Sequence, residues 1–246
     1  MKHQEPQKWP INDSATLVKT PIHYKVQFTS PAYALIQSIV HTHILPGAYT
    51  DDQYRTLTFK AHSVRTQMIA PLPIATIGSM LPTLVRQLEY LLRVQKCTIY
   101  GIGPADIILI NDTIPMFVGS EWVLRLEEDR EEEDREEEDR EEEDREEVGM
   151  VTRPFVSTEA YFSPEVLEIR QLPSSIHYKT AYASLGLWII VLLVGDDAFY
   201  RDYIRHKQLD QCLDLLRTHP VFQTRLYGVL SRCLVEDPTQ RCLLLL

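Results

Sequence analysis

Thiols and carboxylates are the side chains of this chain that could bind a metal or assist a reaction, and their spacing argues against the commonest sites. The chain has four cysteines: Cys97, Cys212, Cys233 and Cys242. They form no CxxC pair, and no histidine cluster accompanies them at the spacing of a zinc site. Residues 14–50 contain no Asp or Glu, and the first glycine is Gly47. This region therefore provides neither a glycine-rich phosphate loop before residue 47 nor a carboxylate ligand.

The charge of the chain is concentrated in one segment. Residues 127–147 are a tandem EEEDR repeat with 17 Asp or Glu and 4 Arg, a net charge of -13 in a chain of net charge -10. The remainder therefore carries +3, the difference between the two values, and has no strong electrostatic footprint for nucleic acid. The repeat has no apolar residue to bury, so it forms no core. Two readings stay open: a binding segment for basic proteins, and a merely solvated low-complexity expansion.

The apolar pattern predicts a β-rich first part and a helical second part. Three runs of β-branched and aromatic residues predict strands: 15–19, 23–29 and 54–60. Five stretches with helical apolar spacing predict helices: 32–40, 84–94, 183–194, 208–217 and 221–235. Residues 61–82 contain three prolines and a glycine and predict a loop-rich segment. Two apolar runs joined by Asn111-Asp112 predict a hairpin over 107–118.

These elements predict an α+β fold with two lobes. We expect residues 1–13 to be a polar tail, 14–66 a reduced β-rich lobe and 67–246 a helical lobe, with 127–147 as an acidic insertion. The apolar run 183–195 has 13 residues, too few for a membrane span, which needs about 20. The first residues lack the apolar core of a signal peptide. We therefore expect an intracellular protein of the cytoplasm or nucleus, with no membrane contact.

Three motifs in the second half resemble those of protein kinases. Residues 157–168, STEAYFSPEVLE, resemble the end of a kinase activation segment, which reads GTxxYxAPEVL. Ser184-Leu-Gly186 and the apolar run after it resemble the WSLG helix of that family. Residues 230–241, LSRCLVEDPTQR, resemble the closing LxxCLxxDPxxR motif. The resemblance implies a bilobal protein kinase-like fold and covers residues 84–246 well and 15–83 weakly.

The resemblance also implies which residues hold the helical lobe together. In the family, the Glu of the APE motif and the closing Arg form a buried ion pair, and both are kept here as Glu165 and Arg241. Removing one partner of such a pair would leave a buried charge, at a cost of about 3–5 kcal/mol. The other matched structural positions are Pro164, Gly186 and Asp237.

Compared with the kinase motifs, the chain lacks most of the residues that phosphoryl transfer needs. The position of the catalytic base is Gly101, and the lysine of that loop is Gly103. Phe117 stands where the DFG motif has its metal-binding Asp, and residues 113–120 contain no carboxylate. Lys25 is near the position of the phosphate-binding lysine, although the tightest register places Gln27 there. Without a partner Glu, Lys25 also fits an ordinary surface lysine.

Asp106 is the one polar residue of a kinase metal site that has a counterpart here. It replaces the metal-binding Asn, and a carboxylate is an adequate ligand for Mg²⁺. Alone it would bind weakly, and a loop-capping aspartate is the other reading. We therefore predict no catalytic residue, no dedicated metal site and no required cofactor, with Lys25 and Asp106 as the contacts for ATP and Mg²⁺ if nucleotide binding persists.

Three functions remain open at this point. The first is a catalytically inactive pseudokinase that acts as a scaffold or regulator by binding proteins. The second is an atypical active serine/threonine kinase, and the third is a pseudokinase that binds nucleotide without turnover. A compact kinase relative with a long acidic repeat also resembles proteins carried by large DNA viruses.

Overall fold

The computed structural model describes residues 6–51, 53–68, 71–127, 148–196 and 198–243. The chain begins with a five-stranded antiparallel sheet in the order β1-β2-β3-β5-β4. The strands are β1 Gln7–Asn12, β2 Ala15–Lys19, β3 Tyr24–Phe28, β4 Tyr49–Thr50 and β5 Thr56–Phe59. Helix α1, Tyr33–His41, follows β3 and contributes its buried face to the core under the sheet. The strands and the helix predicted for this region are confirmed, with small shifts at their ends.

The structure differs from the prediction at the start of the chain. Residues 7–12, expected to belong to a polar tail, form β1 at the edge of the sheet. Residues 7–10 are exposed, so the sequence shows no buried periodicity there. Pairing with β2, in which Trp9 lies opposite Leu17, makes this segment a strand.

Helix α2, Ile74–Arg93, is ten residues longer at its start than the predicted helix. Ile77, Met80 and Leu81 extend its buried face into the segment that we expected to be a loop. Pro82 lies inside the helix, where it removes one backbone hydrogen bond. Burial of the added apolar residues outweighs that loss, which is why the prolines of 71–82 misled the prediction.

A second, three-stranded sheet contains the predicted hairpin. Its strands are β6 Val64–Arg65, β9 Ile107–Ile110 and β10 Ile114–Phe117, in the order β10-β9-β6. Asn111 and Asp112 both have positive φ in the turn, as residues with short polar side chains can. Asn111 Oδ1 accepts a hydrogen bond from the amide of His62 at 2.7 Å, and Arg65 pairs with Asp112 at 2.7 Å. The hairpin prediction is confirmed.

The acidic repeat is inserted at the end of another antiparallel hairpin. Strands β7 Cys97–Ile99, β11 Val123–Glu127, β12 Val148–Val151 and β14 Ser174–His177 form a sheet in the order β14-β12-β11-β7. Glu127 and Val148 are cross-strand partners, so the chain leaves and re-enters the fold at neighbouring positions. The expectations for the repeat itself concern residues outside the described ranges.

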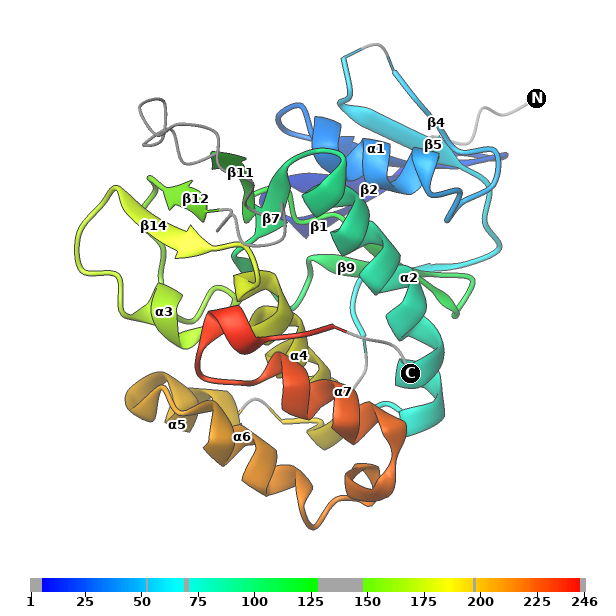
Figure 1. Ribbon diagram of the computed structural model, residues 1–246. Helices are drawn as coiled ribbons and strands as arrows, with labels where there is room; N and C mark the ends of the chain where they lie inside the picture. The colour runs from blue at the N-terminus through cyan, green and yellow to red at the C-terminus, as the bar shows by residue number, and fades with distance from the viewer. Residues whose placement is uncertain (1–5, 52, 69–70, 128–147, 197, 244–246) are drawn as a thin grey trace, which may run out of the picture.

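The second half is mainly helical. Its helices are α3 Pro164–Leu167, α4 Thr180–Val194, α5 Ala198–His206, α6 Leu209–Leu216 and α7 Arg225–Cys233, with 3-10 turns η2 Pro220–Gln223 and η3 Pro238–Gln240. Figure 1 shows this helical part below the first sheet. Helix α4 is buried almost all round, which explains its continuous apolar run. Helix α5 was not predicted. No helix within the described ranges combines the length and apolarity needed to cross a membrane.

Two apolar cores hold the molecule together. The larger is built around α2, α4 and α7. The smaller lies under the first sheet and includes α1 together with Ile108, Ile110 and Met116 of the β9–β10 hairpin. A short pair of strands, β8 Gly101–Ile102 and β13 Tyr161–Phe162, lies in the larger core. The chain is therefore a mixed α/β protein with several antiparallel sheets.

Candidate functional site

The structure brings together two of the segments that the sequence singled out. The backbone amide of Val118 donates to the carbonyl of Asp106 at 2.7 Å, so residues 117–119 lie beside the turn formed by Gly103–Asp106. Phe117 is buried, and its amide donates to Gln87 Oε1 of α2 at 3.0 Å. Residues 103–106 and 117–119, far apart in the sequence, are therefore neighbours in the fold.

Asp106 is enclosed by hydrogen-bond donors of the chain itself. Its Oδ2 accepts from the backbone amide of Gly103 at 2.5 Å, and its Oδ1 accepts from Asn12 Nδ2 at 2.8 Å. Burial raises the pKa of Asp106, and the hydrogen bonds from Gly103, Asn12 and Trp122 act in the opposite direction. The carboxylate thus caps a turn and is bound to a strand of the first sheet.

Both carboxylate oxygens of Asp106 accept hydrogen bonds from the chain itself, which hold the side chain in place. Across the described part of the chain, no group of three or more His, Cys, Asp or Glu side chains is placed to hold a metal ion.

The position expected for a catalytic base has no room for a side chain. A Cβ built on Gly101 would lie 2.4 Å from Cε1 of Phe162, and Phe162 is fully buried among Tyr100, Trp122 and Phe155. Gly103 is equally tight, because its Cβ would lie 2.7 Å from Asp106 Oδ2. These glycines are required by close packing, and a single substitution could not restore a base or a lysine there.

Lys25 lies on the far face of the first sheet. Successive side chains of a strand point to opposite faces, and Tyr24, Val26 and Phe28 of β3 face the core with α1. Lys25 is half-buried on the other face, beside Val18 and Thr58 of the neighbouring strands. Gln27, the alternative in the sequence, shares that face. The structure therefore does not bring Lys25 to Asp106.

Side chains fill the space between the first sheet and the β9–β10 hairpin. Ile108, Met116 and Val118 are fully buried in the same core as Leu17 and Val26 of the sheet. A nucleotide base placed between these strands would have to displace this core. Apolar side chains of both parts therefore occupy the space between these strands.

The matched structural residues are brought together as the sequence suggested. Arg241 forms two parallel bonds with Glu165: Nη1 to Oε1 at 2.5 Å and Nη2 to Oε2 at 2.9 Å. Thr180 Oγ1 of α4 also donates to Glu165 Oε1, at 2.8 Å. Arg241 is almost fully buried. Burial alone would raise the pKa of Glu165, but the hydrogen bonds and charge of Arg241 outweigh burial and hold it below its usual value.

The remaining matched residues have structural roles. Pro164 is the first residue of α3, where its missing N–H costs nothing. Gly186 of α4 faces Leu234, whose Cδ2 would lie 2.9 Å from an added Cβ. Asp237 caps η3 by accepting hydrogen bonds from the amide and hydroxyl of Thr239 at 2.9 and 2.8 Å.

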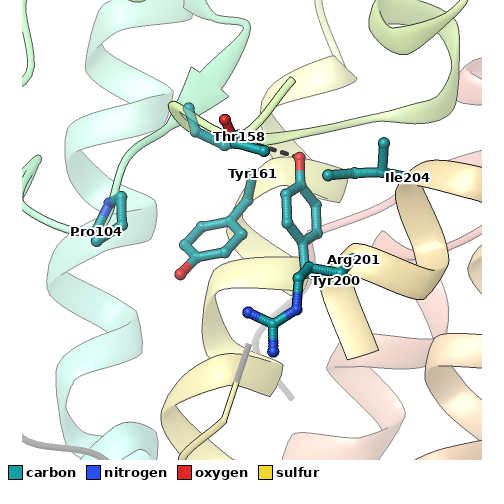
Figure 2. A pocket seen from close by; sticks show the side chains of 7 residues that line it. Pro104, Thr158, Tyr161, Tyr200, Arg201 and Ile204 are labelled. Carbon is teal, nitrogen blue, oxygen red and sulfur yellow. Dashed lines mark hydrogen bonds between the residues drawn. The ribbon is translucent and has the colours of Figure 1, made fainter. Parts of the chain in front are cut away.

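A hollow of about 210 Å³ opens between residues 158–161 and α5 (Figure 2). Figure 2 shows Pro104 on one side and Arg201 and Ile204 of α5 on the other. The rings of Tyr161 and Tyr200 pack edge to face at 4.9 Å between their centroids, and Tyr200 Oη donates to the carbonyl of Ala160 at 2.7 Å. Two packed, largely buried tyrosine rings therefore form part of the wall.

Two features of the site were not predicted from the sequence. Asn12 was assigned to the tail, although Asn-Asp-Ser is a turn signal that could have marked its hairpin. The residues of α5 were not predicted to be helical, and no local pattern indicated that they face residues 158–161.

Comparison of the sequence with protein-family models and with curated proteins found no match.

Proposed function

We propose that this protein is a catalytically inactive member of the kinase-like fold class that acts by binding other proteins. The observation that carries this proposal is the apolar core shared by the first sheet and the β9–β10 hairpin. Ile108 and Val118 are fully buried in that core. In an active kinase the corresponding interface would have to admit a nucleotide. The antiparallel sheet with one helix, followed by a helical part with the Glu165–Arg241 pair, supports the assignment to this fold class.

The arrangement of polar groups supports the loss of catalysis. The expected base position is Gly101, where Phe162 leaves no room for a side chain. Asp106 is committed to Gly103 and Asn12, and Lys25 lies on the opposite face of the sheet. Phosphoryl transfer depends on charges aimed at the phosphate: Gly101 carries none, Asp106 directs its carboxylate at Gly103 and Asn12, and Lys25 points away from both.

The hollow beside α5 is the surface that we assign to a protein partner. Its tyrosine walls and Ile204 suit an apolar side chain of the partner. The acidic repeat, outside the described residues, would add attraction to basic regions of a partner. Such attraction weakens as salt is added.

Two measurements test this proposal. The melting temperature should not change with millimolar ATP, with or without Mg²⁺ or Mn²⁺, and high protein concentrations should show no phosphotransfer. A shift with ATP and no turnover would instead favour a nucleotide-binding pseudokinase. Turnover abolished by Asp106→Ala would favour an atypical active kinase.

Partner binding is tested at the hollow itself. Thr158→Arg would fill the exposed rim, and Ile204→Glu would place a charge against its apolar wall. Both variants should lose a partner captured by the intact chain, whereas Arg217→Glu, on the exposed end of α6, should keep it. Retention by all three variants would exclude the hollow as the docking surface.

A further inference from the structure

A side-chain hydrogen bond joins the turn between β1 and β2 to the turn Gly103–Asp106. Asn12 ends β1, and its Nδ2 donates to Asp106 Oδ1 at 2.8 Å although 94 residues separate the two. Asn12 is partly buried and Asp106 is buried. The contact therefore joins the edge hairpin of the first sheet to the centre of the candidate site.

Both partners are oriented before they meet. The side-chain oxygen of Asn12 accepts from the amide and the hydroxyl of Ser14, each at 3.0 Å, which turns its NH2 group toward Asp106. The other carboxylate oxygen of Asp106 accepts from Gly103, and Trp122 is a third donor. Each of these neighbours donates a hydrogen bond, so Asp106 serves as an acceptor on both of its oxygens.

Close packing fixes the carboxylate in this place. A Cβ on Gly103 would lie 2.7 Å from Asp106 Oδ2, and a Cβ on Gly119 would lie 2.5 Å from Oδ1. Glycine on both sides thus makes a cradle for the side chain of Asp106. The amide of Val118 also donates to the carbonyl of Asp106, which anchors the residue through its backbone.

We propose that Asn12 and Asp106 form a clasp, a side-chain hydrogen bond that keeps the β1–β2 hairpin closed over the candidate site. The hairpin turn is short, because Asn12 and Ala15 are cross-strand partners. Its two strands pair with each other, and β2 also pairs with β3. The charge-assisted bond of Asn12 to Asp106 and the packing of Ile11 and Ala15 in the smaller core hold the turn itself. The clasp concerns how the β1–β2 hairpin is held, and it is independent of partner binding at the hollow beside α5.

Hydrogen exchange of the backbone amides of residues 7–19 tests the clasp. Asn12→Asp keeps the acceptor for Ser14 and replaces the donor by a second carboxylate. Asp106→Asn keeps an acceptor for Gly103 and turns a donor toward Asn12. We expect each single variant to raise exchange in the hairpin about tenfold, the lower end of the effect of losing a hydrogen bond to a charged group. Exchange in α4 should stay unchanged.

The exchanged pair makes the test specific. In Asn12→Asp combined with Asp106→Asn, the amide at 106 can donate to the carboxylate at 12 while its oxygen still accepts from Gly103. This variant should recover most of the protection, and Asp13→Asn, a change at the exposed neighbouring residue, should leave it unchanged. Unchanged hairpin exchange in both single variants would overturn the clasp. Exchange that rises equally in α4, or a combined variant as unprotected as the single ones, would also overturn it.

Discussion

Arg241, buried near the C-terminal end of the described chain, holds Glu165 at the start of α3 by two parallel hydrogen bonds across 76 residues. The guanidinium also donates to the carbonyls of Val235 and Glu236, at 2.8 and 3.1 Å. This bidentate pair connects the segment after α7 to the segment before α4. It fixes the last part of the chain against the centre of the helical core.

Removal of Arg241 should destabilise the fold severely. Arg241→Ala leaves Glu165 largely buried without its cation, which costs about 3–5 kcal/mol in comparable pairs. Urea unfolding should show this loss. Arg241→Lys should recover only part of it, because an ammonium cannot form the two parallel bonds. Equal stability of Arg241→Ala and the parent would show that the pair is not structural.

The same pair should make stability depend on acid pH. The pKa of Glu165 is lower in the folded chain than its ordinary value, about 4.3 in unfolded chains. Its contribution is therefore complete above that ordinary value and is lost as the pH falls through the lower, folded-state value. We expect the difference in unfolding free energy between the parent and Glu165→Gln to shrink from pH 5 toward acid. A difference that stays constant would contradict this assignment.

Restoring a carboxylate at the expected base position should damage the protein and should not activate it. Gly101→Asp forces a side chain against the buried ring of Phe162, and overpacking of this kind costs about 1–3 kcal/mol. Gly228→Ala in α7 is the control, because its added Cβ meets open space. That variant should be neutral or more stable by about 0.5–1 kcal/mol. Phosphotransfer by Gly101→Asp would refute our reading of this position.

Two positions on opposite faces of the first sheet should respond very differently. Lys25→Ala, on the outer face, should change stability by no more than about 0.5 kcal/mol. Leu57→Ala, on the inner face of β5, should cost about 2–5 kcal/mol because it opens a cavity in the smaller core. Denaturant unfolding of both variants checks this. A large loss for Lys25→Ala would place that lysine in the core.

The acidic repeat should be dispensable for folding. Glu127, its first residue, and Val148, which follows it, are cross-strand partners, so replacing residues 128–147 by Asn-Gly joins them through a two-residue hairpin turn. Shortening the loop should stabilise the fold by about 2 kcal/mol or less, since closure entropy varies slowly with length. Urea unfolding measures the change. If the shortened chain failed to fold, the repeat would have a structural role.

The sequence alone determined the local elements and several absences. Alternating and helical apolar patterns located β2, β3, α1 and the β9–β10 hairpin, because burial of one face dictates residue type at each step. The lack of acids in residues 14–50 and of glycine before Gly47 is a property of composition that no fold can alter. The motifs around Glu165 and Arg241 pointed correctly to their pairing.

Only the tertiary structure decided which residues meet. Strand register placed Lys25 on the outer face, and a shift by one residue would have turned it inward. Asn12 contacts Asp106 across 94 residues of sequence. Gly101 contacts Phe162 across more than 60 residues. Local patterns carry no information on such contacts, because they depend on how whole elements pack. The sequence singled out Gly101 and Asp106, and packing decided that Gly101 has no room for a side chain and that Asp106 meets Asn12.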